Sequence, residues 1–414
     1  MSRHDYGDHT MATTASLIAS RMDRIKPSPS SAASARVREL QAQGRDIIGL
    51  TTGEPDFPTP DHIKQAAVRA LETDQTRYTN PDGTIELKTA VQGKFRRENG
   101  LDYALDQIIV STGSKQSLFN ALLATVEEGD EVIIPAPFWV SYIDMVLLAG
   151  GRPVVLSCLE EHGFKLQAEQ LERAITPRTK WVMLCSPNNP SGATYSREEM
   201  KALAEVLLPH PKIHVISDDI YEHLIYDGRE FVTLAQVEPR LYERTLTVNG
   251  VSKAYSMTGW RLGYAGGPRE LIKNMAKLQS QSTTNPSSIS QFAAIAALEG
   301  PQGFIAERSR EFQHRRDVVV GMLNRIPGLS CRTPEGAFYV FPSCAGLIGK
   351  RTPAGETLNN DRDVILYFLD AAGVGVLQGE VYGMSPYFRI STASDLATLE
   401  EGCRRIAGAV GRLT

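Results

Sequence analysis

Residues 245–267, TLTVNGVSKAYSMTGWRLGYAGG, give the most informative pattern in the chain. Two short β-rich runs, 245–250 and 262–267, flank a loop of small residues that carries Lys253. Most lysines are solvated at the surface, but a lysine held in a desolvated pocket has a lowered pKa and becomes a Schiff-base nucleophile. The flanking glycines and apolar residues favour the second interpretation. Arg261, eight residues after Lys253, suits a bidentate contact with a phosphate.

The region before this stretch has a regular alternation of β-rich runs and helical segments, starting near residue 105. The runs cover residues 107–112, 131–135, 153–158, 181–187 and 214–219. Several are apolar on consecutive residues, which is typical of strands buried on both faces. The pattern predicts an α/β domain with a mostly parallel sheet covered by helices.

The chain ends follow a different pattern. Near the N-terminus, helices are predicted over 30–44 and 61–72, with a strand at 46–50 between them. A further helix follows the loop at 76–84 and ends at about Asn99, and a long helical region covers about 268–325. Strands near 337–341, 374–377 and 387–391 and helices at about 361–372 and 395–411 follow. We therefore expect an arm (1–25), a large domain (61–305) and a smaller α+β domain built from residues 26–60 and 306–414.

The composition describes a chain large enough for two or three domains. It has 414 residues, with 44 Lys and Arg against 48 Asp and Glu, a net charge of −4, and 42% hydrophobic residues. This composition disfavours a disordered chain and a nucleic-acid-binding protein. No apolar run approaches the ~20 residues of a membrane span, and the N-terminus lacks the apolar core of a signal peptide.

The five cysteines, Cys158, Cys185, Cys331, Cys344 and Cys403, include no C-x-x-C pair. They predict neither a disulfide framework nor a zinc site, so no metal is expected. A cytoplasmic location, with no nucleic-acid or membrane partner, is the expectation.

Two junctions between strands and the following segments carry further polar residues. VSTGSKQ (110–116) runs from a strand through Gly113 and Ser114 into a helical pattern. Such a junction offers free backbone N–H groups to a phosphate, with Ser114 able to cap the helix and to donate its hydroxyl. A plain helix cap is the alternative. SPNNPSG (186–192) fixes a turn in which Asn188 or Asn189 presents an amide, unless both serve the turn alone.

Two charged residues stand within apolar strands. Asp218, in HVISDDIYEHL (214–224), lies where a strand ends, the place where ligands bind in open α/β sheets, with Tyr221 three residues later. The alternative is that Asp218 or Asp219 caps a following helix. Arg389, in PYFRIST (386–392), needs an anionic partner, either a substrate carboxylate or a structural ion pair.

Together, SPNNPSG, SDDIYEHL, SKAYSMTGWRLGY and FRIS resemble the class I aminotransferases, which are fold-type I pyridoxal-phosphate enzymes. GEPDFPTP (53–60), YTNPDG (78–83) and APFWVSY (136–142) match as well, so the resemblance covers about residues 20–410. It is strongest for the bacterial aspartate aminotransferases, including those that accept prephenate. The resemblance implies a three-layer large domain with a mostly parallel seven-stranded sheet, a smaller α+β domain, and a homodimer with active sites shared between subunits.

The resemblance also implies how pyridoxal 5′-phosphate is held. Lys253 would bind it covalently and move the proton, Asp218 would keep its ring nitrogen protonated, and Tyr221 and Asn189 would hydrogen-bond its ring oxygen. Trp139 would stack on the ring. The phosphate would contact Gly113, Ser114, Ser252 and Arg261, with Lys115 nearby and Tyr78 reaching in from the partner subunit.

For the substrate, the resemblance implies that Arg389, Asn189 and the Gly53 backbone fix the α-carboxylate beside Trp139. Lys115 matches a lysine that meets the distal carboxylate of aspartate or glutamate, although this chain reads G-S-K-Q where the group has G-G-K-Q. Lys26 matches a lysine linked to prephenate use; its alternative is a solvated surface residue.

The expected activity is a ping-pong transfer of the amino group of L-aspartate or L-glutamate to a 2-oxo acid, 2-oxoglutarate or oxaloacetate. A prephenate or aromatic aminotransferase is the alternative within the fold, since a few side chains decide it. A pyridoxal-phosphate-dependent lyase is a second class. A non-enzymatic sensor is disfavoured, because no basic helix-turn-helix precedes residue 60.

Overall fold

The computed structural model describes residues 17–414. Most of the predicted arm, residues 1–16, lies outside the described residues. Within the remainder, a short 3-10 helix, Ser20–Arg24, packs against helix α5 (Ser141–Leu148) of the larger lobe.

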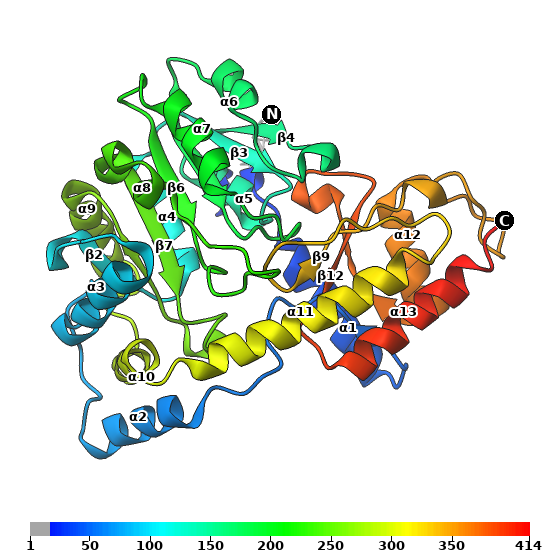
Figure 1. The fold of residues 1–414 in the computed structure, drawn as a ribbon, viewed down its shortest axis with the longest axis horizontal. Helices are drawn as coiled ribbons and strands as arrows, with labels where there is room; N and C mark the ends of the chain where they lie inside the picture. The colour runs from blue at the N-terminus through cyan, green and yellow to red at the C-terminus, as the bar shows by residue number, and fades with distance from the viewer. Residues whose placement is uncertain (1–16) are drawn as a thin grey trace, which may run out of the picture.

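The larger lobe is built on a seven-stranded sheet with the order β2-β8-β7-β6-β5-β3-β4 (Figure 1). The strands are β2 (Ile108–Ser111), β3 (Glu131–Ala136), β4 (Arg152–Ser157), β5 (Thr179–Cys185), β6 (His214–Asp218), β7 (Thr245–Gly250) and β8 (Gly263–Gly266). Only β8 runs antiparallel to its neighbours β2 and β7. The predicted mostly parallel seven-stranded sheet is confirmed, and all seven strands coincide with the β-rich runs of the sequence.

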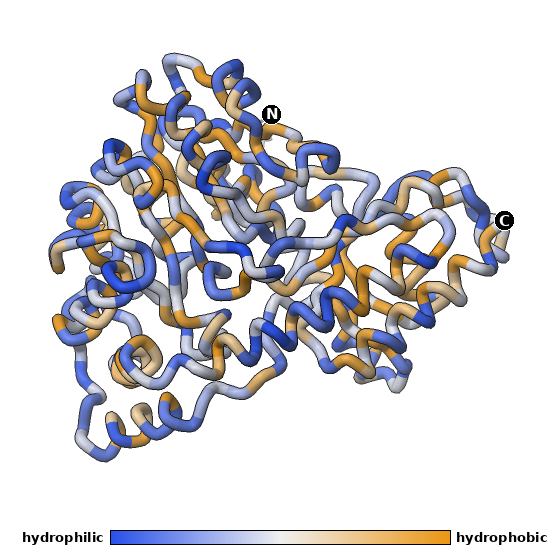
Figure 2. The backbone as a smooth tube through the Cα atoms, viewed as in Figure 1, coloured by the Kyte–Doolittle hydropathy of each residue, from blue (hydrophilic) through white to orange (hydrophobic). Residues whose placement is uncertain are grey.

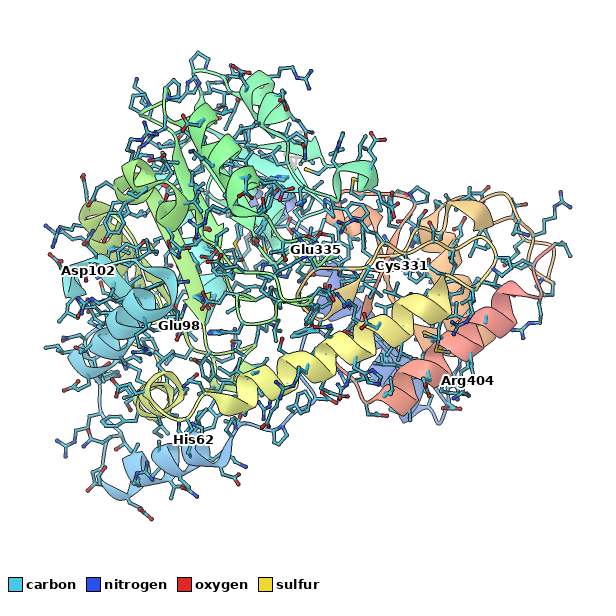
Figure 3. All side chains as sticks on the ribbon, viewed as in Figure 1. His62, Glu98, Asp102, Cys331, Glu335 and Arg404 are labelled. Atoms are coloured by element: carbon cyan, nitrogen blue, oxygen red, sulfur yellow. The ribbon has the colours of Figure 1, made fainter. Side chains whose placement is uncertain are left out.

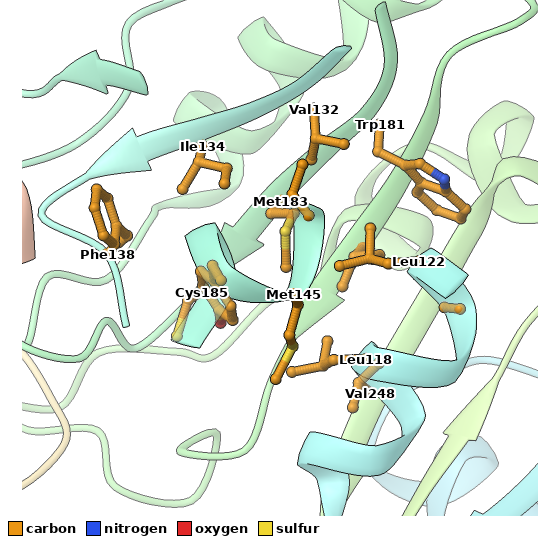
Figure 4. Close-up of a cluster of buried hydrophobic side chains, with 14 of the residues drawn as sticks. Leu118, Leu122, Val132, Ile134, Phe138, Met145, Trp181, Met183, Cys185 and Val248 are labelled. Atoms are coloured by element: carbon orange, nitrogen blue, oxygen red, sulfur yellow. The ribbon is translucent and has the colours of Figure 1, made fainter. Parts of the chain in front are cut away.

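Helices cover both faces of this sheet, because its central strands are apolar on both sides. Along β3 and β5 the side chains alternate: Val132 and Met183 face one cluster, while Ile133 and Val182 face the other. The first cluster is closed by α4 (Ser114–Thr125), α5 and α9 (Arg269–Ser280), and the second by α6 (Ala168–Ala174), α7 (Arg197–Leu207) and α8 (Leu234–Val237). Figure 4 shows Leu118, Leu122 and Met145 turned towards the strand residues of the first cluster. The result is the expected three-layer lobe.

A third cluster lies at the β2–β8 edge, where α2 (Asp61–Glu72), α3 (Ile85–Asn99) and α10 (Ser288–Glu299) pack together. Helix α2 has the bounds that the sequence predicted. Figure 2 shows hydrophobic segments along the strands inside the lobe and hydrophilic segments over the outer helices. None of the helices in residues 17–414 is long and apolar enough to cross a membrane.

The smaller lobe is α+β and draws on both ends of the chain. It contains α1 (Pro29–Ala42), β1 (Ile48–Gly49), β9 (Tyr339–Val340), α12 (Asp361–Tyr367), β10 (Val374–Gly375), β11 (Leu377–Gln378), β12 (Phe388–Ser391) and α13 (Leu396–Val410). The N-terminal strand β1 pairs in parallel with β10, and β12 lies between β11 and β9. Leu50 packs in the same core cluster as Val374 and Ile390, so the N-terminal segment completes this lobe.

One helix joins the two lobes. Helix α11 (Gly303–Leu323) packs Ile305, near its start, in a core cluster of the larger lobe, and Leu323, its last residue, in the core of the smaller one (Figure 1). It runs across the predicted domain boundary at residues 305 and 306, which remains a prediction. The long helical region expected over about 268–325 is helical in the structure and consists of three helices, α9, α10 and α11. The breaks fall at Asn285-Pro286 and Gly300-Pro301, since proline cannot continue a helix.

Candidate functional site

A cavity of about 440 Å³ lies at the carboxyl ends of β5, β6 and β7, between the two lobes. The backbone topology places it there, because ligands bind beyond the carboxyl ends of parallel strands. Its lining includes most of the residues singled out in the sequence: Gly53, Ser114, Lys115, Trp139, Asn189, Asp218, Tyr221, Ser252, Lys253, Arg261 and Arg389.

Lys253 lies in the loop after β7 and points into this cavity. Its Nζ donates a hydrogen bond to the backbone oxygen of Gly53 at 2.6 Å. No carboxylate of residues 17–414 lies within 4.0 Å of it as an ion-pair partner. Burial lowers the pKa of Lys253 to about 8, and the charges of Arg389 and Arg261 act in the same direction. About a tenth of the amine is therefore neutral and nucleophilic at pH 7, far more than for an exposed lysine.

Asp218 is the last residue of β6 and is only 5% exposed. The hydroxyl of Tyr142 donates to its Oδ2 at 2.6 Å, while its buried Oδ1 has no donor among the described residues. Burial raises the pKa of Asp218 to about 6, against the opposing effect of the Tyr142 hydrogen bond. A buried carboxylate oxygen without a donor suits a protonated, cationic nitrogen on a ligand.

The alternative role for Asp218 and Asp219, capping a following helix, is excluded because no helix begins there. Asp219 accepts a hydrogen bond from the Ser217 hydroxyl at 2.7 Å instead. The two adjacent carboxylates thus differ: Asp219 is held inside the protein, and Asp218 faces the cavity.

The two asparagines of SPNNPSG also divide their roles. The Asn188 side chain donates to the backbone oxygen of Pro137 at 3.1 Å and accepts from Ser191 at 2.8 Å, which is turn chemistry. Asn189 instead faces the cavity, where its Oδ1 accepts from Nη1 of Arg389 at 2.9 Å.

Arg389 is 2% exposed, on β12. Its Nη2 donates to the Thr51 backbone oxygen at 2.5 Å, and its guanidinium carbon lies 4.5 Å from the centre of the Tyr339 ring. Its buried Nε has no acceptor, and no Asp or Glu of residues 17–414 forms an ion pair with it. The structural ion pair is therefore excluded within these residues, and a buried positive charge remains for an anionic ligand.

The cavity holds a second cationic group at the start of helix α4. Helix α4 begins at Ser114, and Gly113, with φ of 84°, is its N-cap. A Cβ on Gly113 would lie 2.7 Å from Nη2 of Arg261, so the guanidinium lies directly against the helix start. The positive helix end, Arg261 and the buried Ser252 together offer a phosphate-sized anion site.

The expectation that Ser114 caps this helix was wrong, because Ser114 is already the first helical residue. Its hydroxyl donates to the Asn249 backbone oxygen on β7 at 2.7 Å. The hydroxyl proton of Ser114 thus links α4 to the sheet, and the free backbone N–H groups at the start of α4 remain for a ligand.

Lys115 and Trp139 form one wall of the cavity. The Lys115 Nζ lies 4.6 Å from the centre of the Trp139 ring, and Trp139 meets Tyr142 edge to face at 5.5 Å. Burial, followed by the charge of Arg261, lowers the pKa of Lys115. The cation is therefore partly desolvated beside an aromatic face.

Two predicted residues lie elsewhere, and two unpredicted ones belong to the cavity. Tyr78 is 90% exposed and Lys26 is exposed; neither lines the cavity. Tyr142 and Tyr339 line it and hydrogen-bond Asp218 and Tyr221. Tyr142 carried a signal, since it lies three residues after Trp139 in APFWVSY, whereas Tyr339 is hidden in an apolar run.

Comparison with known proteins gives a consistent result. The sequence model of the family described as aminotransferase class I and II matches residues 45–406. The chain is 56% identical to an aspartate aminotransferase of Rhizobium meliloti, over 96% of this chain and 97% of the relative. It is 57% identical to an aspartate/prephenate aminotransferase of Cereibacter sphaeroides, over 92% and 96%.

Solved structures agree with the sequence matches. The crystal structure of the Rhizobium meliloti aspartate aminotransferase superimposes with a TM-score of 0.94 at 56% identity, covering 97% of this chain and 100% of that one. The Thermus thermophilus aspartate aminotransferase with maleate gives a TM-score of 0.89 at 41% identity, covering 95% and 100%.

Proposed function

This chain belongs to the aminotransferase class I and II family, and on that premise we propose that it is an aspartate aminotransferase. It transfers the amino group of L-aspartate or L-glutamate to a 2-oxo acid, 2-oxoglutarate or oxaloacetate. The observation that carries this function is a single cavity with a reactive lysine, an unpaired buried carboxylate and an unpaired buried arginine: Lys253, Asp218 and Arg389.

We propose pyridoxal 5′-phosphate as the cofactor, because the unpaired groups of the cavity match its parts. The start of α4 and Arg261 suit the phosphate, and the free Oδ1 of Asp218 suits a protonated ring nitrogen. Trp139 supplies an aromatic face, and Lys253 supplies the amine. When bound, pyridoxal phosphate supplies an aldehyde that carries the amino group and a ring that withdraws electrons.

Lys253 has two tasks in this mechanism. Its neutral amine would hold the cofactor covalently through the aldehyde. The same amine would take up the proton at the α-carbon of the substrate and give it back there in the reverse half-reaction, which needs a pKa close to the working pH. The value of about 8 that burial imposes meets this requirement, whereas an exposed lysine would remain protonated.

Asp218 and Tyr221 tune the cofactor site. An ionised Asp218 favours the protonated ring nitrogen, and a cation in the cavity in turn keeps Asp218 ionised although burial raises its pKa. Tyr142 holds one oxygen of Asp218, which leaves the other for the ligand. Tyr221 and Asn189 supply hydrogen bonds to the ring oxygen.

Two cations recognise the substrate. Arg389, aligned by Thr51 and Asn189, takes the α-carboxylate together with the Gly53 backbone. Lys115, on the cavity wall beside Trp139, takes the distal carboxylate. The Thermus thermophilus relative was solved with maleate, a dicarboxylate, which supports a two-carboxylate substrate.

We further propose a homodimer in which Tyr78, exposed in the single chain, reaches the phosphate site of the partner subunit. A cytoplasmic location is in keeping with five cysteines that form no disulfide. Prephenate is a second candidate acceptor, favoured by the name of the Cereibacter sphaeroides relative, and Lys26 is the residue to examine for it.

A panel of donors and acceptors tests this function. Aspartate, glutamate, phenylalanine and alanine are each offered to the purified enzyme with pyridoxal phosphate, against 2-oxoglutarate, oxaloacetate and prephenate. We expect the aspartate–2-oxoglutarate pair to give the highest kcat/KM. A higher value for phenylalanine would identify an aromatic aminotransferase instead, and release of ammonia or CO₂ without transfer would identify a lyase.

A further inference from the structure

Tyr339 connects the two halves of the cavity. It lies on β9, next to the strand that carries Arg389, and is 2% exposed. Its hydroxyl is 2.8 Å from the hydroxyl of Tyr221, and the Arg389 guanidinium lies 4.5 Å from its ring centre. One side chain thus touches both the tyrosine expected to serve the cofactor and the arginine expected to serve the substrate.

The position of the Tyr339 hydroxyl is tightly fixed. A Cβ on Gly53 would lie 2.5 Å from this oxygen, so only a glycine leaves it room. Gly53 is also the residue whose backbone oxygen accepts from Lys253. The loop that orients the lysine therefore also restricts the hydroxyl beside Tyr221.

The direction of the Tyr221–Tyr339 hydrogen bond decides what Tyr221 can do. A phenol has one proton, so Tyr221 can donate to a ligand only if its bond with Tyr339 uses its oxygen as the acceptor. The Arg389 cation lies over the ring of Tyr339 and polarises the Tyr339 O–H group, which favours Tyr339 as the donor.

We propose that Tyr339 is a positioning residue that couples the cofactor and substrate sites. Its hydroxyl donates to Tyr221, which directs the Tyr221 proton to the ring oxygen of the bound cofactor, and its ring supports the Arg389 guanidinium. Donation in series strengthens the second hydrogen bond, because each donor polarises the next. This inference rests on the proposed function and assigns to it a residue outside the expected set.

The substitution Tyr339→Phe separates the two roles, because it removes the hydroxyl and keeps the ring. With Tyr221 a weaker donor, the ring oxygen holds the neighbouring proton of the Lys253–cofactor linkage more firmly. We expect the pH midpoint of the visible absorption band of the holoenzyme to rise by about half a unit to one unit. The KM for aspartate should change less than about twofold, since the ring over Arg389 is retained.

Two further variants complete the test. Tyr339→Leu removes the ring as well, so KM should rise about fivefold or more. Tyr264→Phe is the matched control, because Tyr264 also has a buried hydroxyl, without a partner among the described residues, and does not line the cavity. Its midpoint should equal that of the wild type. Thermal unfolding establishes that each variant is folded.

The outcomes separate this proposal from the proposed function. A wild type without a visible band in pyridoxal phosphate overturns both. If the wild type titrates and Tyr221→Phe raises the midpoint, but Tyr339→Phe titrates like the wild type, only the coupling by Tyr339 is overturned. An equal shift in Tyr264→Phe also overturns it, because the effect would then belong to any lost buried hydroxyl.

Discussion

Lys94 is a buried lysine and Lys253 a half-buried one, and both lie near acidic residues, but their surroundings differ. The Lys94 side chain, on α3, has no exposed surface; its Nζ forms an ion pair with Glu222 and a hydrogen bond to Asn99 at 2.7 Å. Asn99 also donates to Glu222 at 2.8 Å. Within residues 17–414, the Lys253 Nζ has one hydrogen-bond partner, the Gly53 backbone oxygen, and lies 5.7 and 5.9 Å from the ring centres of Tyr221 and Phe338. Its pKa is lowered to about 8.

The presence or absence of a carboxylate partner, rather than burial alone, therefore decides whether such a lysine is structural or reactive. A carboxylate in contact compensates the charge and makes Lys94 part of the framework behind Tyr221, the neighbour of Glu222. Without such a partner, Lys253 is available for chemistry. Glu98 (labelled in Figure 3), Glu222 and His223 come close enough to hold a cation, but the ammonium of Lys94 already contacts Glu222 there.

The largest effect is expected for Lys253→Ala. Removal of the amine should abolish the visible band of bound pyridoxal phosphate and lower turnover by about 10⁴-fold or more. Thermal unfolding should change little, because Lys253 has no ion pair to lose within residues 17–414. A variant that retains near-normal transamination would refute the contrast with Lys94.

The substitution Lys94→Met is expected to lower stability rather than to remove a catalytic group. Glu222 would remain buried without its cation, which costs about 3–5 kcal/mol of unfolding free energy, measured by urea denaturation. The double variant Lys94→Met/Glu222→Leu should recover much of this loss, since no unpaired charge remains. A loss below about 1 kcal/mol in the single variant would show that the ion pair contributes little.

Lys115 is a third case, an exposed lysine on the cavity wall. Lys115→Ala should lower kcat/KM for aspartate about 10–100-fold, the value of a charge-assisted hydrogen bond, and leave alanine as donor nearly unaffected. Lys273→Ala, at an exposed lysine outside the cavity, is the control. Equal losses for both donors would remove Lys115 from recognition of the distal carboxylate.

The smallest expected effect is the pH dependence of the rate at which the apoenzyme captures pyridoxal phosphate. Because the neutral amine is the nucleophile, the apoenzyme should capture pyridoxal phosphate faster as pH rises, with a midpoint of about 8. Capture at pH 7 should be about tenfold slower than at pH 9. Stopped-flow absorbance measures this rate, with N-acetyl-lysine methylamide as the exposed reference. An enzyme midpoint near 10 would mean that Lys253 behaves like that reference.

The fold was largely predictable from the sequence because the sheet is buried on both faces. Consecutive apolar residues in strands such as β5 and β6 are a strong local signal. The long helical region was predictable too, and Pro286 and Pro301 marked the breaks between its three helices. The Ser114 cap was misjudged because the hydroxyl bonds to Asn249, a residue 135 positions away that no local pattern reveals.

The site was predictable where chemistry falls at strand ends, and less so where it depends on packing. Asp218 and Lys253 follow strands and could be expected to meet at one edge of the sheet. Tyr142 and Tyr339 bond to partners 76 and 118 residues away, and no local pattern reveals such distant partners. The proposed roles of Tyr78 and Lys26 depend on a partner subunit and on substrate choice, so they stay predictions.

The Arg389–Thr51 hydrogen bond has a consequence for how the chain folds during synthesis. It joins residues 338 positions apart, and the Lys253–Gly53 bond spans 200. Closing a loop of the first length costs about 5 kcal/mol of chain entropy, which only the completed packing of both lobes offsets. During synthesis the nascent chain therefore carries Lys253 long before Arg389 leaves the ribosome. The competent pocket forms last, and a chain truncated before β12 has a lysine without a substrate site.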